Sequence, residues 1–162
     1  MPTTTDPQKA LGSALGRIPS GIFVITVAQG GVETGMLASW VQQCSFKPPL
    51  ITMAVQRGRA ITSLLTQGAV FTLNILEANQ TDMIAHFGKG FALDQNAFEE
   101  IELMREPPHG PILQEALGFM HAKIVSSMPA GDHDVFIAEV TAGRLLDEGQ
   151  PMVHIRKNGF HY

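Results

Sequence analysis

Short apolar runs separated by glycine and proline are the feature that most constrains the fold of this chain. Residues 22–27 and 50–55 are rich in apolar and β-branched side chains and are too short for buried helices. The Gly30-Gly31 pair turns the chain after the first of these runs. Their hairpin-like spacing predicts a mainly β fold, a small antiparallel barrel with short helices at its ends. The predicted strands are residues 22–27, 35–46, 50–55, 70–76, 121–128 and 135–146.

Three short helices are predicted from their capping signals. Asp6 is placed to cap a helix over residues 7–15, whose first position is a proline. A second helix is predicted over residues 59–67, and Thr81 is placed to cap a third that runs to about residue 87. Residues 88–118 are rich in glycine and proline, so we expect them to be irregular and to wrap the body of the fold.

Length and composition favour one globular domain. A chain of 162 residues is long enough to bury a full hydrophobic core. Apolar residues make up 44% and charged residues 16%, a balance that argues against disorder. We therefore expect residues 1–162 to form a single domain, with residues 1–6 as a loose polar arm. Because the formal net charge is -4 and the basic residues are scattered, nucleic acid is not an expected partner.

The cysteine content and the N-terminal sequence favour the cytoplasm. Cys44 is the only cysteine, so no intrachain disulfide can form, which fits a reducing compartment. The first residues, MPTTTDPQKALGSALG, lack the basic and apolar regions of a secretory signal. No apolar run approaches the ~20 residues of a membrane helix. We expect a soluble, cytoplasmic protein that does not bind membranes.

The stretch from Gly35 to Pro49, GMLASWVQQCSFKPP, is unusually polar for a predicted strand. A strand that packs into a core would carry Val, Ile and Leu at these positions. Short hydrogen-bonding side chains instead offer a surface to a flat ligand with polar edges. The side chains of this patch are Ser39, Trp40, Gln42, Gln43, Cys44 and Ser45.

Familiar local motifs for metals, nucleophiles and nucleotides are missing. The six histidines share no HxH or HxxxH spacing and Cys44 has no CxxC partner, so no metal site is predicted. There is no GxSxG motif, and a lone cysteine is more often a small buried hydrophobe than a nucleophile. The GKG sequence at 88–90 is too short for a P-loop. Lys89 either lies in a solvated loop or stands beside a phosphate.

The sequence Gly131-Asp132-His133 has the composition of a tight turn before a strand. Glycine permits the bend, and the aspartate can accept hydrogen bonds from backbone amides within it. His133 then stands at the entrance of a strand, where an imidazole can contact a ligand. An ordinary hairpin turn with an exposed histidine is the other interpretation, and these residues alone leave both open.

Seven segments, in order along the chain, resemble the flavin reductase-like, FMN-binding split-barrel family. The resemblance is strongest to the flavin reductase module at the C-terminus of cyanobacterial diflavin flavodiiron proteins. Most of the chain is covered, and no single segment is decisive. The segments are RIPSGIFVITV (17–27), GMLASWVQQCSFKPP (35–49), FTLNIL (71–76), HFGKGF (86–91), GPIL (110–113), GDH (131–133) and HIRKNGFHY (154–162).

The resemblance implies a fold, a reaction and partners. The fold is a six-stranded antiparallel Greek-key split barrel, usually a homodimer with FMN held partly at the subunit interface. The reaction is NAD(P)H-dependent flavin reduction, in which a hydride passes from the nicotinamide to flavin N5. FMN is the expected cofactor, with FAD as the other option, and NADH or NADPH is the expected co-substrate. Reduced flavin or electrons would pass to a partner oxygenase or another acceptor protein.

The resemblance also implies site residues. His133 matches the position associated with nicotinamide binding and is the expected catalytic residue. An arginine beside the predicted helix 59–67 suits a phosphate. The expected cofactor-binding residues are Leu37, Ala38, Ser39, Trp40, Gln43, Cys44, Ser45, Val55, Gln56, Arg57, Arg59, Ala60, Phe87, Gly88, Lys89 and Tyr162.

The chain departs from many flavin reductases at three positions of the polar stretch. Those proteins have threonine at position 37 and a Ser-Phe pair at 40 and 41, where this chain has Leu37, Trp40 and Val41. The WVQQ form resembles the flavodiiron-linked modules. The alternative function is an FMN-binding electron-transfer module without its own nicotinamide site. A split barrel like pyridoxamine-phosphate oxidase is less favoured, because the basic residues are few.

Overall fold

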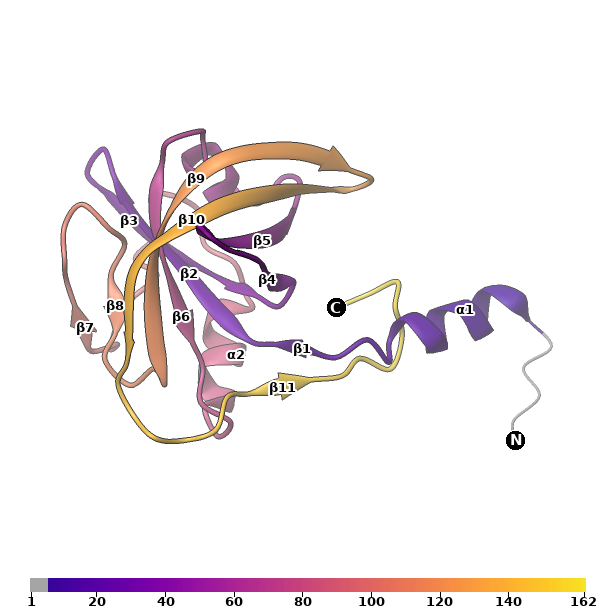
Figure 1. Ribbon diagram of the computed structural model, residues 1–162. Helices are drawn as coiled ribbons and strands as arrows, with labels where there is room; N and C mark the ends of the chain where they lie inside the picture. Colours follow the sequence, from indigo (N-terminus) through magenta and orange to yellow (C-terminus); the bar gives the residue numbers. More distant parts are fainter. Residues whose placement is uncertain (1–5) are drawn as a thin grey trace.

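A curled antiparallel sheet forms the body of the molecule (Figure 1). The computed structural model describes residues 6–162, so residues 1–5 of the predicted arm lie outside the described residues. The elements in chain order are α1 (Pro7–Leu15), β1 (Ser20–Gly21), β2 (Phe23–Gln29), β3 (Val32–Ala38), β4 (Val41–Phe46), β5 (Pro49–Gln56), the 3-10 helix η1 (Ala60–Leu64), β6 (Val70–Ile75), α2 (Thr81–Phe87), β7 (Leu103–Met104), β8 (Ile112–Leu113), β9 (Gly118–Ala130), β10 (His133–Leu145) and β11 (Val153–His154).

The two edge strands of the main sheet are neighbours in the sequence. The sheet has seven strands in the order β3-β2-β6-β9-β10-β5-β4, and Ser39 and Trp40 connect β3 to β4. The sheet therefore curls until its edges approach each other at this bend. Within residues 6–162 no hydrogen-bonded ladder joins β3 to β4, so the expected closed barrel of six strands is corrected to an open, curled sheet of seven. The bend also divides the predicted strand 35–46 into two.

The predicted helix over residues 59–67 is wrong in type and length. The segment forms only the five-residue 3-10 helix η1. The Thr62 hydroxyl donates to the Arg59 carbonyl at 2.6 Å, and the Ser63 hydroxyl donates to the Ala60 carbonyl at 3.0 Å. Backbone bonds from Leu65 to Thr62 keep the same three-residue spacing. Hydroxyl side chains that bond to nearby carbonyls compete with α-helical pairing, which accounts for the short 3-10 turn.

The other predicted helices form, with one correction to a cap. Asp6 caps α1, since its side chain accepts a hydrogen bond from the Gln8 amide. Helix α2 begins at Thr81 itself, and Gln80 rather than Thr81 holds the capping position. The Gln80 side chain turns back instead and accepts from the Glu77 amide at 2.7 Å. The long loop 88–118 is mostly irregular, as predicted, apart from the short pair β7–β8.

Two hydrophobic cores lie on opposite faces of the sheet. Successive side chains of a strand point to opposite faces, so Ile25 of β2 enters the core inside the curl while Val24 enters the other. The second core is closed by α2 and by the loop 88–118, through Phe87 and Phe98. The apolar run at the start of β2 is therefore explained by burial on both of its faces.

A buried polar cluster ties the loop 88–118 to the central strands. The Thr72 hydroxyl donates to the Gly110 carbonyl at 2.7 Å, and the Thr26 hydroxyl donates to the Pro111 carbonyl at 2.5 Å. His121 contacts Thr72 through Nδ1 and the Glu106 carboxylate through Nε2, at 3.0 and 2.9 Å. Polar groups of the loop, namely two backbone carbonyls and the carboxylate of Glu106, thereby find hydrogen-bond partners among the buried side chains. The buried polar members of the cluster are Thr26, Thr72, Asn74 and His121, and they are surrounded by Glu106, His109, Phe119 and the exposed Arg144.

Acid should destabilise this cluster through His109. Its ring stacks on His121 with the centroids 3.9 Å apart, and burial, with the charge of His121, lowers the pKa of His109 below 6.5. The unfolded chain therefore takes up the proton first, so the contribution of His109 is fully present above pH 6.5 and is lost as the pH falls through the folded pKa. We expect the melting temperature to drop as the pH falls below about 6.5, and His109→Gln to flatten that drop.

Differential scanning calorimetry across this pH range measures the effect. His161→Gln, which removes an exposed histidine of the C-terminal tail, is the control and should keep the wild-type slope. Hydrogen bonds from the partners of Glu33, Glu106 and Asp132 lower the pKa of each carboxyl, so a separate loss is expected only below about pH 4.5. An unchanged slope in His109→Gln would assign the acid sensitivity to another group.

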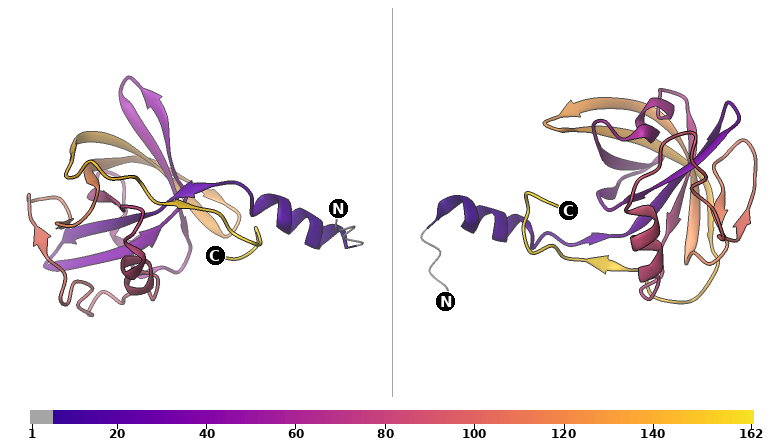
Figure 2. Two further views of the ribbon diagram at one scale, coloured as in Figure 1. Left: turned by 90° about the horizontal axis from the view of Figure 1, so that it is seen from below. Right: turned by 180° about the vertical axis from the view of Figure 1, so that it is seen from behind.

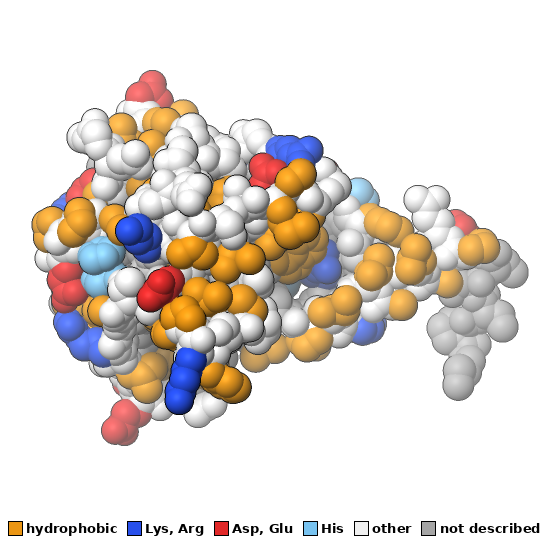
Figure 3. All heavy atoms as spheres, turned by 45° about the horizontal axis from the view of Figure 1, so that its top comes forward, with side chains coloured by type: hydrophobic (Ala, Val, Ile, Leu, Met, Phe, Trp, Pro, Cys, Tyr) orange, Lys and Arg blue, Asp and Glu red, His pale blue; other side chains and the backbone are white. Residues whose placement is uncertain are grey.

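An arm built from both ends of the chain stands away from the body (Figure 2). Strand β1 pairs with β11, and the Gly159 amide donates to the Gly12 carbonyl of α1 at 2.7 Å. A side chain at Gly159 would collide with Leu15, so glycine allows the tail to lie directly on the helix. Figure 3 shows apolar side chains along this arm. Among residues 6–162, no helix is both long and apolar enough to cross a membrane.

Candidate functional site

A cavity of about 260 Å³ lies where the ends of β3, β5 and α2 meet, and we call it the main cavity because predicted cofactor residues gather in it. Apolar side chains form most of its wall. Within residues 6–162 the lining includes the cation Arg59 but no aspartate or glutamate, which favours an anionic or neutral ligand. The lining residues are Ile22, Met36, Leu37, Ala38, Ser39, Ala54, Val55, Gln56, Arg59, Ile84, Phe87, Gly88, His154 and Tyr162.

Strand periodicity and a close contact explain why these elements leave a cavity. In β5 the side chains of Ala54 and Gln56 share the face opposite the buried Met53, so they turn toward the cavity. Helix α2 ends at Phe87, and the Gly88 amide donates to the Ile84 carbonyl at 2.9 Å. A β-carbon at Gly35 would come within 3.0 Å of the Phe87 ring, so this glycine lets α2 lie close against β3.

One end of the main cavity is positively charged. The half-buried Arg59 donates from Nη2 to Oε1 of Gln56 at 3.2 Å, which orients the guanidinium. Within residues 6–162, Arg59 forms no ion pair, whereas the neighbouring Arg57 is paired with Asp134 at 3.1 Å. A guanidinium that is oriented but not neutralised is suited to a phosphate group.

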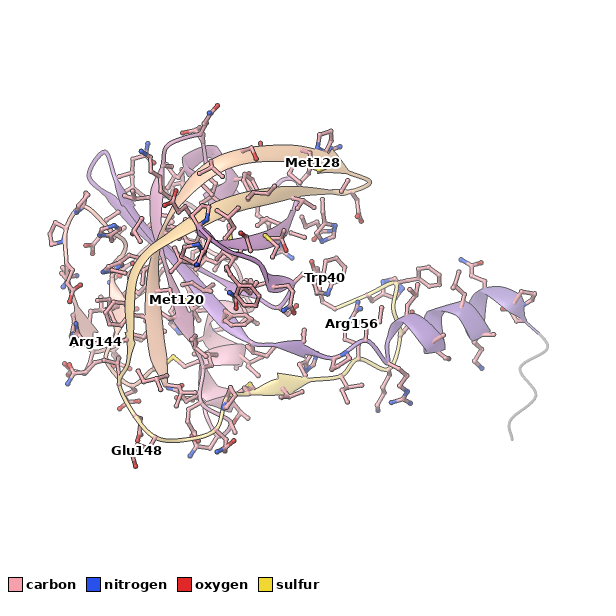
Figure 4. All side chains as sticks on the ribbon, viewed as in Figure 1. Trp40, Met120, Met128, Arg144, Glu148 and Arg156 are labelled. Atoms are coloured by element: carbon pink, nitrogen blue, oxygen red, sulfur yellow. The ribbon has the colours of Figure 1, made fainter. Side chains whose placement is uncertain are left out.

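A second cavity, of about 290 Å³, adjoins the first. Gln56 and Tyr162 line both, so these two side chains stand at the boundary between the cavities. Figure 4 shows Trp40 and Arg156 between the body and the arm, where the guanidinium carbon of Arg156 lies 5.0 Å from the Trp40 ring centroid. The lining residues of the second cavity are Trp40, Gln56, Asp132, His133, Arg156, Gly159, Phe160, His161 and Tyr162.

His133 is held from both sides in the second cavity. It is the first residue of β10, after the turn at Gly131, and it is almost fully buried. Its Nδ1 lies 2.7 Å from a carboxylate oxygen of Asp132, and its Nε2 lies 2.5 Å from the Tyr162 hydroxyl. The hydrogen bond from His133 lowers the pKa of Asp132, so this carboxylate stays ionised and accepts the Nδ1 proton. Nε2 is then the ring nitrogen that faces the Tyr162 hydroxyl.

Comparison with known proteins identifies the family. A sequence model described as the flavin reductase like domain matches residues 15–161. The chain belongs to the flavin reductase-like domain family. Diflavin flavoprotein A 1 of Synechocystis sp. is 41% identical over 154 residues, which cover 94% of this chain but only 27% of that protein. The chain thus spans less than a third of the length of this relative, and the predicted resemblance to diflavin proteins is confirmed.

Solved flavin reductases have the same fold as this family member. The NADH:FAD oxidoreductase SgcE6 of Streptomyces globisporus superposes with a TM-score of 0.85 at 25% identity, covering 96% of this chain and 94% of that chain. The styrene monooxygenase flavin reductase of Pseudomonas putida superposes with a TM-score of 0.74 at 27% identity, covering 88% and 90%. This chain is therefore a flavin reductase-like domain in fold as well as in sequence.

The flavin reductase-like fold brings many of the predicted cofactor residues to one place. They come from the ends of β3 and β5, from the residue before η1, from the end of α2 and from the tail. Tyr162 lies at the boundary with the second cavity, which holds the predicted His133. The predicted residues that line the main cavity are Leu37, Ala38, Ser39, Val55, Gln56, Arg59, Phe87, Gly88 and Tyr162.

Other predicted cofactor residues lie elsewhere in this chain. Trp40 lies beyond the bend and lines the second cavity, where its ring is 4.7 Å from that of His133. Gln43, Cys44 and Ser45 belong to the edge strand β4 and do not line the main cavity. The main cavity is also not lined by Arg57, Ala60 or Lys89. Among residues 6–162 no group of three His, Cys, Asp or Glu side chains could hold a metal ion.

Several lining residues were missed by the sequence interpretation. Ile84 lies one turn before Gly88 on α2, and the helical spacing from Phe87 could have indicated it. Ala54 alternates with Val55 on β5, a signal that a strand pattern also carries. Ile22 and His154 reach the cavity because β1 pairs with β11, a contact over more than 130 positions that no local pattern reports.

The main cavity fits the ring system and phosphate of a flavin. A flavin has flat apolar faces, polar edges and, in FMN, a phosphate. Leu37, Ile84 and Phe87 would offer apolar surface to the faces, and Ser39 and Gln56 would offer hydrogen-bonding groups to the edges. Arg59 would hold the phosphate. A bound flavin would supply the electron-accepting ring, and the protein would supply the orientation of that ring and its electrostatic surroundings.

Proposed function

We propose that this chain is an NAD(P)H-dependent flavin reductase that binds FMN, with FAD as the other option. The proposed reaction is hydride transfer from the reduced nicotinamide to N5 of the flavin. The observation that carries the proposal is the adjacency of the two cavities, which share Gln56 and Tyr162. The similarity to the Streptomyces NADH:FAD oxidoreductase, of which a second structure holds NAD and FAD fragments, supports a dinucleotide site.

The residues of the two cavities have separate tasks under this proposal. Arg59 and the apolar wall hold the flavin in the main cavity, and His133 positions the nicotinamide at the boundary. Trp40 gives the second cavity a flat aromatic wall, and Arg156 adds a cation to it. Rate then comes from bringing the two rings together in the correct orientation, with no proton-transfer residue required.

Anaerobic stopped-flow absorbance tests the proposed reaction. The oxidised flavin absorbs near about 450 nm, a property of the cofactor, and mixing with NADH or NADPH should bleach this band. Comparison of the two dinucleotides also decides the co-substrate preference. Failure of both to bleach the band would rule out the proposed reaction.

His133→Ala should raise the KM for the nicotinamide about three- to tenfold, because one positioning hydrogen bond is lost. The kcat should change less, since the flavin site does not include this side chain. Steady-state kinetics with the preferred dinucleotide measures both, and circular dichroism checks that the variant is folded. An unchanged KM would place the nicotinamide elsewhere.

An electron-transfer module without a nicotinamide site is the second candidate. One observation favours it: Tyr162 already occupies the hydrogen-bonding position on Nε2 of His133. Such a module would receive electrons from a partner protein. The bleaching experiment separates the two candidates, because only a reductase responds to NADH or NADPH without a partner.

Finer features of the protein also belong to the proposal. We propose that residues 1–162 form one domain, that two copies associate, and that the protein works in the cytoplasm and passes reduced flavin or electrons to an oxygenase or another acceptor. The exposed Phe46 on β4, 87% accessible, supports association between copies. The free, exposed Cys44 suits a reducing compartment.

A further inference from the structure

We propose that Tyr162 competes with the nicotinamide for His133. The Tyr162 hydroxyl occupies the hydrogen-bonding position on His133 that the carboxamide of the dinucleotide would take. The inference rests on the proposed function, because it assumes that the second cavity receives the dinucleotide. It adds a role for Tyr162 that flavin binding does not require: this residue sets how tightly the co-substrate binds.

The hydrogen bonds of His133 make the two partners mutually exclusive. Nδ1 of His133 is taken by the carboxylate of Asp132, so Nε2 is the ring nitrogen left for a second partner, and the Tyr162 hydroxyl already lies against it. Partial burial raises the pKa of Tyr162, so the hydroxyl keeps its proton and donates it to Nε2. The NH₂ group of a carboxamide is also a donor. One ring nitrogen cannot bond to both partners at the same geometry, so the dinucleotide must displace the hydroxyl.

The packing of Tyr162 allows this displacement. Its side chain is 63% exposed, and its ring lies 5.4 Å from the Trp40 ring at a tilt of 44°, so it is not locked in a core. The tail is anchored further back, where the amides of Arg156 and Gly159 donate to carbonyls of α1 and its cap. The Arg156 guanidinium also donates to the His161 carbonyl at 3.4 Å, so the displacement is a rotation of the exposed Tyr162 side chain while the arm stays in place.

The position of Tyr162 explains why its movement matters for both ligands. Its side chain lines the main cavity as well as the second, so it stands between the proposed flavin and nicotinamide sites. Moving it aside opens the boundary at which the two rings would have to meet. The dinucleotide can bind only to molecules in which the contact between Tyr162 and His133 is broken. Its apparent Kd is therefore the Kd for those molecules divided by the fraction of the protein that they make up.

Tyr162→Phe tests the competition, because it keeps the ring and removes the hydroxyl. Isothermal titration calorimetry on the flavin-loaded protein, with NAD⁺ and with NADP⁺ as redox-inactive probes, should show a Kd about three- to tenfold lower than that of the wild type. The KM for the matching reduced dinucleotide should fall by a similar factor. Ile155→Ala, an exposed tail residue outside both cavities, should leave the Kd unchanged.

The fluorescence of Trp40 gives an independent readout of the tail. The chain has one tryptophan, which contacts His133, Tyr162 and Arg156, so its emission should shift in Tyr162→Ala and when a probe binds to the wild type.

Two outcomes separate this inference from the proposed function. If the wild type reduces flavin but Tyr162→Phe binds the probes no more tightly than the wild type, the inference is overturned and the proposed function stands. A wild type and variants that neither bind the probes nor reduce flavin would overturn both.

Discussion

Gly110→Ala is expected to lower the free energy of unfolding by about 3–5 kcal/mol, among the largest effects of any single substitution. A β-carbon at this position would collide with the carbonyl group of Thr26 and lie 2.6 Å from the amide nitrogen of Val27. Both are backbone atoms of β2, which is hydrogen-bonded to a strand on each side, so neither can move aside. The loop cannot retreat either, because the Thr72 hydroxyl holds the Gly110 carbonyl at 2.7 Å.

Chemical denaturation followed by circular dichroism measures this loss. Gly30→Ala is the matched control, because it tests glycine replacement in a turn with φ of 59° and open space around the new methyl group. Backbone strain alone should cost this control about 1–2 kcal/mol. A Gly110→Ala variant no less stable than the control would mean that the loop 88–118 can lift from the sheet without loss.

Arg59→Ala is expected to raise the Kd of FMN about 10- to 100-fold. The guanidinium lies in the main cavity, is oriented by Gln56 and has no carboxylate partner within residues 6–162. A charge-assisted hydrogen bond to a phosphate contributes about 1.5–3 kcal/mol, which sets the size of the effect. Titration of FMN fluorescence gives the Kd directly.

Riboflavin is the control ligand for this prediction, because it has the same ring without the phosphate, and its affinity should change little. Arg57→Ala is the control variant. Arg57 is paired with Asp134 and lies outside the cavity lining, so its removal should leave FMN binding unchanged. An equal weakening of riboflavin and FMN would show that Arg59 shapes the cavity rather than binding the phosphate.

The strands of the sheet could be predicted because their signal is local. The run at the start of β2 and the alternation of Ile51, Met53 and Val55 in β5 each indicate burial without knowledge of the partner strand. The arm contrasts with them. Its short strands β1 and β11 pair only because the two ends of the chain meet, and their two-residue lengths leave no periodicity to detect.

The polar stretch after Gly35 shows where sequence interpretation stopped. Its polarity predicted one ligand-facing strand, but the bend at Ser39 and Trp40 sends its two halves to opposite edges of the sheet. Leu37 stays at the main cavity, while Cys44 lies exposed on β4. An edge strand exposed to solvent has the same polar composition as a strand facing a polar ligand, so composition could not separate the two.

The sequence by itself determined the family, the mainly β architecture and most of the residues at the main cavity, because apolar runs and short motifs act within a few positions along the chain. Only the tertiary structure decided how Tyr162 relates to His133. These residues lie 29 positions apart in the sequence. They meet because Asp132 orients the His133 ring and because the residues before Tyr162 are hydrogen-bonded to α1 and its cap. A hydrogen bond between distant segments depends on the path of the whole backbone, and no local pattern in the sequence carries that path.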